Sequence, residues 1–286
     1  MNYTTLISVA QLRQLPMQDG QLMVFDCSFE LMKPAAGDQQ YHETHIAGAL
    51  RANLDRDLSA AVGAHTSSGG RHPLPTREAF ANWLGSVGLG NQMQAVVYDR
   101  QGANYCGRLW WMLKWAGHEN VAVLDGGLQA WVAQGGSVAS GPQPAWPQQD
   151  FLLREPLATL ATTQQVSDGL GHNNRAIVDA RAGPRFRGEV EPLDPVAGHI
   201  PGALNRPFGL NLDADGRFKD GPTLRREFEA LLDGRDPSGV VHHCGSGVSA
   251  VPNIIAMEVA GLGRGALYAG SWSEWCSDPV RPVARG

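Results

Sequence analysis

One cysteine of this sequence lies where backbone amide groups can make it reactive. Cys244 follows the apolar run 239–243 and precedes a glycine-rich stretch, 245–249, before a helix expected to begin near Ala250. Glycine lets a loop curl tightly, and a curled loop that enters a helix points several N–H groups at one place. Such a place binds an anion and favours the thiolate, the nucleophilic form of cysteine. Cys244 is therefore the predicted nucleophile, in an anion-binding loop formed with Gly245, Ser246, Gly247, Val248 and Ser249.

The other three cysteines lack such neighbours. Cys27 follows a predicted strand, Cys106 lies inside a predicted helix, and Cys276 lies near the C-terminus, where we expect partial exposure. The cysteines form no CxxC pair, and no His/Cys cluster has the spacing of a zinc site. The sequence therefore predicts no disulfide framework and no metal, and it gives no reason to expect an organic cofactor.

Three kinds of thiol chemistry can be compared with the loop. Phosphate ester hydrolysis needs an arginine after the loop, but the residue that follows Ser249 is Ala250. A papain-like protease needs a distant His and Asn, and has no need of an anion-binding loop. A persulfide anion on Cys244 needs a ring of neutral donors, which the loop N–H groups and the hydroxyls of Ser246 and Ser249 provide. The loop therefore favours a persulfide.

The sequence also contains one pattern twice. Residues 95–117 match residues 239–261, and this alignment places Arg100 opposite Cys244, so the first copy lacks the nucleophile. The histidines of the repeated HIxGA element, His45 and His199, occur in both copies, and we interpret them as structural. Further matching pairs are VFDCS (24–28) with IVDAR (177–181), HIAGAL (45–50) with HIPGAL (199–204), and LDGGLQAW (124–131) with YAGSWSEW (268–275). We infer a duplicated domain.

Each copy alternates short apolar runs with stretches of helical spacing. This alternation predicts parallel strands joined by helices. The expected strands are 22–26, 95–99 and 121–125, then 176–180, 239–243 and 265–269; the expected helices are 77–88, 104–117, 223–234 and 249–261. The predicted fold class is α/β: two tandem domains, each a mostly parallel sheet with helices on both faces. The predicted divisions are a first domain at 1–136, without the catalytic cysteine, a linker at 137–156, and a catalytic domain at 157–286.

Composition excludes several other classes of protein. The formal net charge of −5 argues against a nucleic-acid-binding protein, and 43% hydrophobic residues argue against disorder. No apolar run approaches about 18 residues, so we expect no membrane span. The N-terminus lacks a basic start followed by a long apolar stretch, and we therefore expect no signal peptide and a cytoplasmic protein.

The motifs HIAGAL, HIPGAL, LDGGLQAW, CGSGVSA and YAGSWSEW together resemble those of two-domain rhodanese-type sulfurtransferases, over roughly residues 5–280. The resemblance implies two rhodanese-like domains with the active cysteine in the second. It also implies that a small donor gives a sulfane sulfur to Cys244. The persulfide then passes this sulfur to a thiophilic acceptor, such as cyanide, a thiol or thioredoxin.

The loop also resembles one class within this family. Thiosulfate enzymes carry basic residues after the cysteine, whereas the 3-mercaptopyruvate class carries a CGSGVT-like loop, which CGSGVS resembles. An uncharged loop attracts a dianion less than a basic loop does. The resemblance therefore implies 3-mercaptopyruvate as the donor, with thiosulfate as the alternative. A sulfur-carrier module with slow turnover is a second alternative.

A donor with a carboxylate needs a cationic partner. Segment 179–200 supplies Arg181, Arg185 and Arg187, and the family's GRFRG-like motif maps onto residues 184–188. The resemblance thus implies that Arg185 binds the donor carboxylate through a bidentate pair. The 3-mercaptopyruvate class carries a second arginine a few residues on. This chain reads Glu191-Pro192-Leu193 there, so that arginine is missing.

The resemblance further implies a proton relay at the loop serine. The mercaptopyruvate enzymes place a His and an Asp near this serine, in an arrangement similar to a serine protease. The matching residues here are Ser246, His72 and Asp55, with Asp57 as a near alternative to Asp55. Such a relay would move a proton to the pyruvate enolate.

Overall fold

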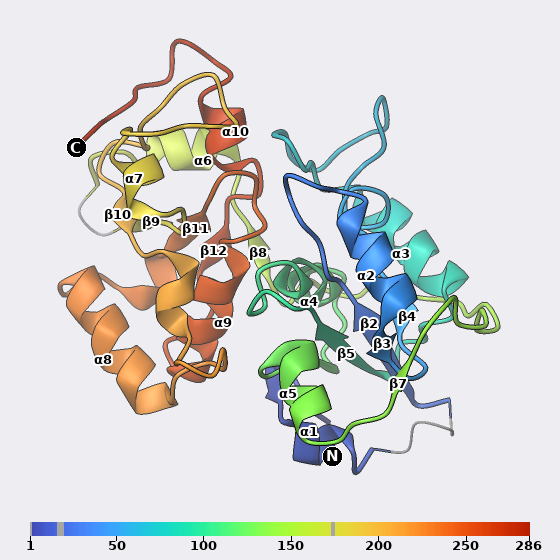
Figure 1. The fold of residues 1–286 in the computed structure, drawn as a ribbon. Helices are drawn as coiled ribbons and strands as arrows, with labels where there is room; N and C mark the ends of the chain where they lie inside the picture. The colour runs from blue at the N-terminus through green and yellow to red at the C-terminus, as the bar shows by residue number, and fades with distance from the viewer. Residues whose placement is uncertain (1, 16–19, 173–174) are drawn as a thin grey trace. The chain divides into compact units, whose positions relative to one another are not determined.

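The computed structural model describes residues 2–15, 20–172 and 175–286 (Figure 1). The chain divides into two compact units. The first holds Met1–Ser67, Pro75–Leu157 and Asp215–Arg217, and the second holds Ser68–Leu74, Ala158–Ala214 and Phe218–Gly286. Segment Ser68–Leu74 thus belongs to the second unit, although the division drawn from the sequence placed it in the first domain. No helix within the described residues is long and apolar enough to cross a membrane.

The first unit is built on a five-stranded parallel sheet with the order β1-β6-β5-β2-β4. The apolar runs in β5 and β2 are buried along their whole length, as expected of strands covered on both faces. Its strands are β1 (Leu6–Ile7), β2 (Leu22–Asp26), β4 (Leu50–Arg51), β5 (Gln94–Tyr98) and β6 (Val121–Leu124), and β3 (His45–Ile46) pairs separately and antiparallel with β7 (Val138–Ala139). Its helices are α1 (Val9–Leu12), α2 (Ala36–Glu43), α3 (Arg77–Ser86), α4 (Cys106–Trp115) and α5 (Gly127–Ala133).

The second unit repeats this topology. Its sheet has the order β10-β9-β11-β12-β8, again parallel, and β11 occupies the central place that β5 has in the first unit. Helices α8 and α9 pack against each other beside this sheet (Figure 1). The strands are β8 (Thr159–Leu160), β9 (Ile177–Asp179), β10 (Leu204–Asn205), β11 (Val241–His243) and β12 (Ala266–Leu267). The helices are α6 (Thr163–Asp168), α7 (Gly183–Phe186), α8 (Gly221–Leu232), α9 (Val251–Val259) and α10 (Ser271–Trp275), with 3-10 turns η1 (Phe208–Asn211) and η2 (Pro237–Gly239).

The predicted α/β fold is confirmed, and all six predicted strands are present. The prediction missed the other strands, which are β1, β3, β4, β7, β8 and β10. Each of these has only two residues, which is too short to produce a recognisable alternation of apolar and polar side chains.

The two HIxGA histidines have matching structural contacts. His45 Nδ1 lies 2.7 Å from the carbonyl oxygen of Tyr41, and the two rings stack at 4.1 Å. His199 Nδ1 lies 2.8 Å from the carbonyl oxygen of Phe186, and these rings stack at 3.8 Å. Each histidine also pairs with the last extended segment of its unit, His45 in β3–β7 and His199 in a bridge to Ala284. These contacts give both histidines a structural role.

Three of the cysteines are ordinary buried thiols. Cys27 and Cys106 are 1% exposed, and burial raises the pKa of both thiols. The prediction of partial exposure for Cys276 is wrong, because this residue ends α10 and packs into the core that contains Ile200 and Trp272. Burial also raises the pKa of the Cys276 thiol. A raised pKa keeps a thiol protonated and therefore poorly nucleophilic.

The sheet of the second unit also buries a titratable side chain, and this predicts a pH dependence of stability. His242 on β11 is fully buried with its Nε2 3.1 Å from Met257 Sδ, and burial lowers the pKa of His242 to about 3. An unfolded histidine has a pKa of about 6.5. Between these two values only the unfolded chain binds the proton, so the stabilising contribution of His242 is present above pH 6.5 and is lost as the pH falls.

We expect the free energy of unfolding to fall by up to about 1.4 kcal/mol per pH unit below about pH 6.5 through this residue. His242→Gln should flatten that slope, while the same substitution at the exposed His65 should leave it unchanged. Denaturant unfolding of the full chain between pH 7 and pH 4 measures the slopes. Equal slopes for His242→Gln and the unsubstituted chain would contradict this assignment.

Candidate active site

The predicted nucleophile lies at the carboxyl end of the central strand of the second sheet. Strand β11 ends at His243, the loop 244–250 follows, and α9 begins at Val251 with Pro252 in its first turn. Cys244 is 2% exposed. The carboxyl edge of a parallel sheet is where α/β proteins bind ligands, and the N-terminus of α9 adds the positive end of a helix dipole.

Hydrogen bonds to α10 hold the first part of this loop. The N–H of Cys244 donates to Ser271 Oγ at 3.1 Å, the N–H of Trp272 donates to the Cys244 carbonyl at 3.0 Å, and the N–H of Ser273 donates to the Gly245 carbonyl at 2.9 Å. The carbonyls of the first two loop residues are therefore turned toward α10. Sequence reasoning missed this role of Ser271.

The backbone of Ser271 is left-handed, with φ of +55°. Its hydroxyl donates to the Tyr268 carbonyl at 2.9 Å, so the buried side chain bridges the loop and the end of β12. The repeat contains a signal for this conformation: Gly127, which aligns with Ser271, also has a positive φ of +57°. A serine in place of glycine carries backbone strain, and the two hydrogen bonds offset that strain.

Apart from Cys244 and Ser246, the predicted loop contains four residues, and these are closely packed. Gly247 has φ of +72°, and a Cβ there would lie 2.2 Å from the Ala269 carbonyl oxygen, so this position requires glycine. Val248 is 4% exposed, Gly245 is buried, and Ser249 is half-buried.

The first unit shows what a loop of this shape binds. There the Asp99 carboxylate accepts hydrogen bonds from the N–H groups of four residues of the loop and of the start of α4 (Gln101, Ala103, Tyr105 and Cys106) at 2.8 to 3.0 Å. Their aligned residues in the second unit are 245, 247, 249 and 250, but His243 stands where Asp99 stands. The second unit thus has no carboxylate at the aligned position, and a cysteine follows that position.

The structure brings His72 and Ser246 together. His72 Nδ1 lies 2.7 Å from Ser246 Oγ, and the two residues are 5% and 6% exposed. Segment Ser68–Leu74, which carries His72, is held to α10, because the N–H of Gly69 donates to Glu274 Oε2 at 3.1 Å. This contact is suited to moving a proton between the imidazole and the hydroxyl.

Asp55 lies in the first unit, in the turn after β4. Its side chain is exposed, and its N–H donates to Asn53 Oδ1 at 2.9 Å. The carboxylate of Asp57 accepts from the N–H of Asn53 at 2.7 Å and pairs with Arg56. The participation of Asp55 in a relay stays a prediction.

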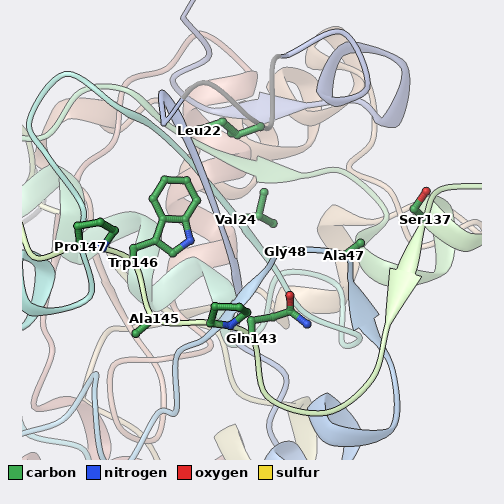
Figure 2. A pocket seen from close by; sticks show the side chains of 10 residues that line it. Leu22, Val24, Ala47, Gly48, Ser137, Gln143, Ala145, Trp146 and Pro147 are labelled. Carbon is green, nitrogen blue, oxygen red and sulfur yellow. The ribbon is translucent and has the colours of Figure 1, made fainter.

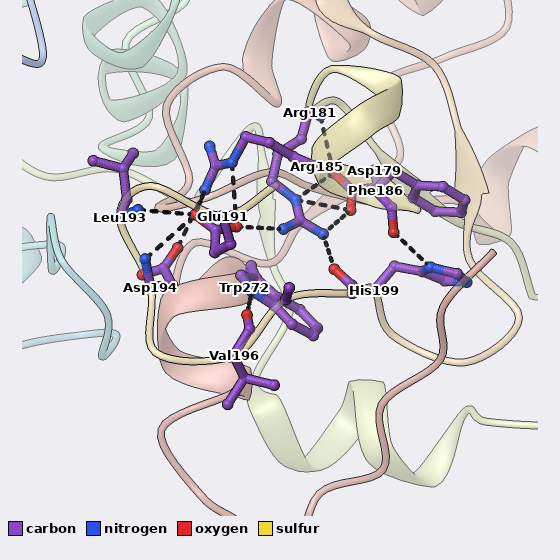
Figure 3. A network of polar contacts seen from close by, with 12 residues as sticks. Asp179, Arg181, Arg185, Phe186, Glu191, Leu193, Asp194, Val196, His199 and Trp272 are labelled. Carbon is purple, nitrogen blue, oxygen red and sulfur yellow. Dashed lines mark hydrogen bonds and ion pairs between the residues drawn. The ribbon is translucent and has the colours of Figure 1, made fainter. Parts of the chain in front are cut away.

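Arg185 lies in the last turn of α7 within a network of buried charges (Figure 3). Its Nη2 is 2.6 Å from Glu191 Oε1 and 3.3 Å from Asp194 Oδ2, and the two acidic side chains are 3% and 4% exposed. Arg185 therefore is oriented by buried carboxylates rather than solvated. The exposed Arg187 pairs with Glu189 outside this network.

Arg181, in contrast, has a structural role, because buried groups of the second unit already occupy its guanidinium. It forms an ion pair with Asp179 at 2.7 Å, lies 4.7 Å over the Trp272 ring and donates to the Gly198 carbonyl. Burial raises the pKa of Asp179, but His243 and Arg181 outweigh this effect and lower the pKa overall. The pair therefore remains charged, and its role is to fix the end of β9.

A separate cavity of about 520 Å³ lies in the first unit (Figure 2). Apolar side chains dominate its wall, and the lining contains no acid, base or thiol. The lining residues are Leu22, Val24, Ala47, Gly48, Ser137, Gln143, Pro144, Ala145, Trp146 and Pro147. This cavity therefore offers no group for thiol chemistry.

The fold and the site define an α/β protein with a buried thiol at the carboxyl end of the central strand of its second sheet. The sequence pattern of the Rhodanese-like domain matches the chain twice, at residues 8–134 and 162–278. The chain therefore belongs to the rhodanese family, with two such domains in tandem, and it is an enzyme of the sulfurtransferase class.

Known proteins resemble the chain over most or all of its length. A protein of Pseudomonas aeruginosa with the name "Probable 3-mercaptopyruvate sulfurtransferase" is 45% identical, over 100% of both chains. The thiosulfate sulfurtransferase of Gallus gallus is 34% identical over 89% of this chain and 86% of its own. The structure of 3-mercaptopyruvate sulfurtransferase from Leishmania major superposes with a TM-score of 0.83 at 29% identity, covering 98% of this chain and 75% of that one.

The strained serine predicts an unusual order of stabilities. Ser271→Ala and Ser271→Gly both remove the acceptor of the Cys244 N–H, which costs about 1–3 kcal/mol for a buried group. Glycine also relieves the left-handed strain, so Ser271→Gly should be more stable than Ser271→Ala by about 1 kcal/mol. Denaturant midpoints of the full chain measure this difference.

The exposed Ser277, whose φ is not positive, serves as the control. There the order should be reversed, with alanine more stable than glycine. Equal midpoints for the two Ser271 variants would show that the strain is absent.

Proposed function

We propose that the chain transfers a sulfane sulfur from 3-mercaptopyruvate, through a persulfide on Cys244, to a thiophilic acceptor. The observation that carries this proposal is the anion-binding loop. In the first unit the loop N–H groups bind the Asp99 carboxylate, whereas the aligned loop of the second unit has a histidine in place of that carboxylate and begins with a cysteine. A persulfide is an anion of suitable charge for that place.

The donor step balances without a cofactor. The Cys244 thiolate attacks the sulfur of 3-mercaptopyruvate, the new S–S bond forms, and the C–S bond breaks with its electrons passing to the pyruvate enolate. The thiol proton of the donor then reaches the enolate, which becomes pyruvate. Arg185 binds the donor carboxylate through Nη1, the guanidinium nitrogen that Glu191 and Asp194 leave available.

Ser246 and His72 carry the proton in this proposal. The hydroxyl of Ser246 exchanges a proton with His72 Nδ1 across 2.7 Å and delivers it to the enolate. The loop residues Gly245, Gly247, Val248 and Ser249 hold the persulfide, and Asp55 is the acidic residue predicted for the relay.

In the second half of the reaction, the acceptor attacks the outer sulfur and Cys244 leaves as a thiolate. Cyanide, a small thiol and the thiol of thioredoxin all have the required nucleophilicity. The four cysteines are free and buried, which suits a reducing compartment, and we propose that the protein acts in the cytoplasm. We assign the reaction to the domain at 157–286, together with His72 and Asp55.

Thiosulfate is the alternative donor, because a relative that matches 89% of this chain has the name thiosulfate sulfurtransferase. Thiosulfate carries two negative charges, and the cysteine loop itself has no basic side chain to bind the second. A slow sulfur carrier is the other alternative, since the second arginine of the mercaptopyruvate class is missing at 191–193.

The proposal predicts one added sulfur atom on one residue. After treatment with 3-mercaptopyruvate, the intact mass should rise by one sulfur atom in the unsubstituted chain and not in Cys244→Ala. Cys276→Ala is the matched control and should still gain the sulfur. Cyanide or dithiothreitol should remove the sulfur rapidly. A higher kcat/KM for thiosulfate would replace the donor assignment, and slow release to every acceptor would support the carrier.

The relay predicts a loss in kcat rather than in binding. Ser246→Ala and His72→Asn should each lower kcat with 3-mercaptopyruvate by about 10²–10⁴-fold, because general acid–base catalysis contributes this much. The double variant should lose no more than the worse single variant, since the two residues act as one unit. Steady-state pyruvate release measures both effects, and additive losses would contradict a shared proton path.

A further inference from the structure

Two adjoining cavities of the second unit lie at the edge of the sheet opposite to Cys244. The first, of about 140 Å³, is bounded by the segment between α6 and β9, the turn before β10 and the segment after α8. The second, of about 210 Å³, is lined by β8 and by the amino ends of β11 and β12. Cys244 follows the carboxyl end of β11, so these cavities do not belong to the candidate active site.

The first cavity carries a concentration of positive charge. Among the described residues, its lining holds three basic side chains and no acidic one: His172, Arg175 and Arg235. The formal net charge of the whole chain is −5, so acidic composition does not account for this grouping. Neighbouring like charges repel each other, and an anion between them removes that repulsion. The cavity is therefore suited to an anion.

Both arginines have N–H groups left for a ligand. Within the described residues, the Arg175 guanidinium has no hydrogen bond or ion pair, and Arg235 uses only Nη1, which donates to the Leu232 carbonyl at 2.9 Å. Asp236, the acid next to Arg235, instead accepts from the N–H and the hydroxyl of Ser238 at 2.9 and 2.6 Å. A guanidinium with free N–H groups can bind two oxygens of one phosphate.

The second cavity offers a place for an uncharged organic group. Arg175 lines this cavity as well as the first, so its side chain lies between them. The wall includes the apolar side chains of Val240 and Ala266. It also includes the Thr159 hydroxyl and Gln165 Nε2, which have no hydrogen-bond partner in the part of the chain that the structure describes. Apolar walls with a few polar groups are typical of sites for small organic ligands.

We propose that the two cavities form one binding site for a phosphate monoester. The phosphate lies in the first cavity, where Arg175 and Arg235 bind its oxygens and His172 donates a ring N–H. The organic part extends past Arg175 into the second cavity and forms hydrogen bonds with Thr159 and Gln165. This site is separate from sulfur transfer, and the inference does not depend on the proposed function.

The charge of the site favours a phosphate over a single carboxylate. A phosphate monoester carries about two negative charges near neutral pH and has three acceptor oxygens. A carboxylate carries one charge on two oxygens. Two guanidinium groups and an imidazole N–H in one cavity therefore match the phosphate in both charge and number of donors.

The probe for the first test is adenosine monophosphate, with adenosine and inorganic phosphate as its two halves. Isothermal titration calorimetry of the full chain should show that adenosine monophosphate binds at least about 10-fold more tightly than either half, because only the joined ligand fills both cavities. Added salt should weaken this binding, since it screens the charges of partly exposed groups.

Variants of the lining residues test which groups bind the probe. Arg175→Gln and Arg235→Gln should each weaken binding of adenosine monophosphate by about 10- to 100-fold, as expected when a charge-assisted hydrogen bond is lost. Thr159→Val should weaken it by about 2- to 10-fold and leave the binding of inorganic phosphate unchanged. Arg226→Gln is the matched control, because it removes an exposed arginine of α8 that lines neither cavity.

Three results would overturn this site: no binding of adenosine monophosphate, equal affinities for it and for inorganic phosphate, or undiminished binding by Arg175→Gln. Denaturant midpoints equal to that of the unsubstituted chain establish that the variants are folded. Cys244→Ala should bind adenosine monophosphate normally, and Arg175→Gln should still gain sulfur from 3-mercaptopyruvate. Failure of every variant to gain sulfur would overturn the proposed function and leave the binding results as support for the phosphate site.

Discussion

The convergence of loop N–H groups on one point is the constraint on which this structure depends. Several amide dipoles aimed at the same place are stable only with an anion or a strong acceptor among them. In the first unit the Asp99 carboxylate fills this requirement with four hydrogen bonds. In the second unit the aligned residue is His243, and Cys244 follows it. The aligned loop is thus structural in the first copy, and in the second copy it follows the predicted nucleophile.

The residue of the first copy that aligns with Cys244 also has a structural role. Arg100, which aligns with Cys244, donates to Ser28 Oγ at 2.7 Å and pairs with Asp26 at 3.3 Å. It also donates to the carbonyls of Gln40 and Thr44. At the position of Cys244 the first copy therefore has an arginine that forms hydrogen bonds with several separate segments of its unit. Such contacts stabilise a domain that has no cysteine at this position.

Helix α10 connects the two parts of the candidate site. Its first turn binds the carbonyls of Cys244 and Gly245, and its side chains bind segment Ser68–Leu74 through Ser273 and Glu274. The helix has only five residues, so its own propensity is weak, and its buried tryptophans hold it in the core. Packing of Trp272 and Trp275 thus positions the loop, His72 and Arg71 at once.

The sequence by itself determined the α/β class, the duplication and the central strand, and it singled out Cys244 as the predicted nucleophile. These follow from local patterns: apolar runs, glycines beside Cys244, and matching motifs in order. Tertiary structure decided the rest, because a local pattern contains no distances between remote segments. Arg71 stands in a Gly/Ser-rich stretch with no helical or strand period, and only its ion pair with Asp194 shows that it lies beside Arg185. The role of Ser271 also could not be identified from the sequence. Its left-handed backbone and its hydrogen bond to the Cys244 N–H exist only once α10 packs against the loop.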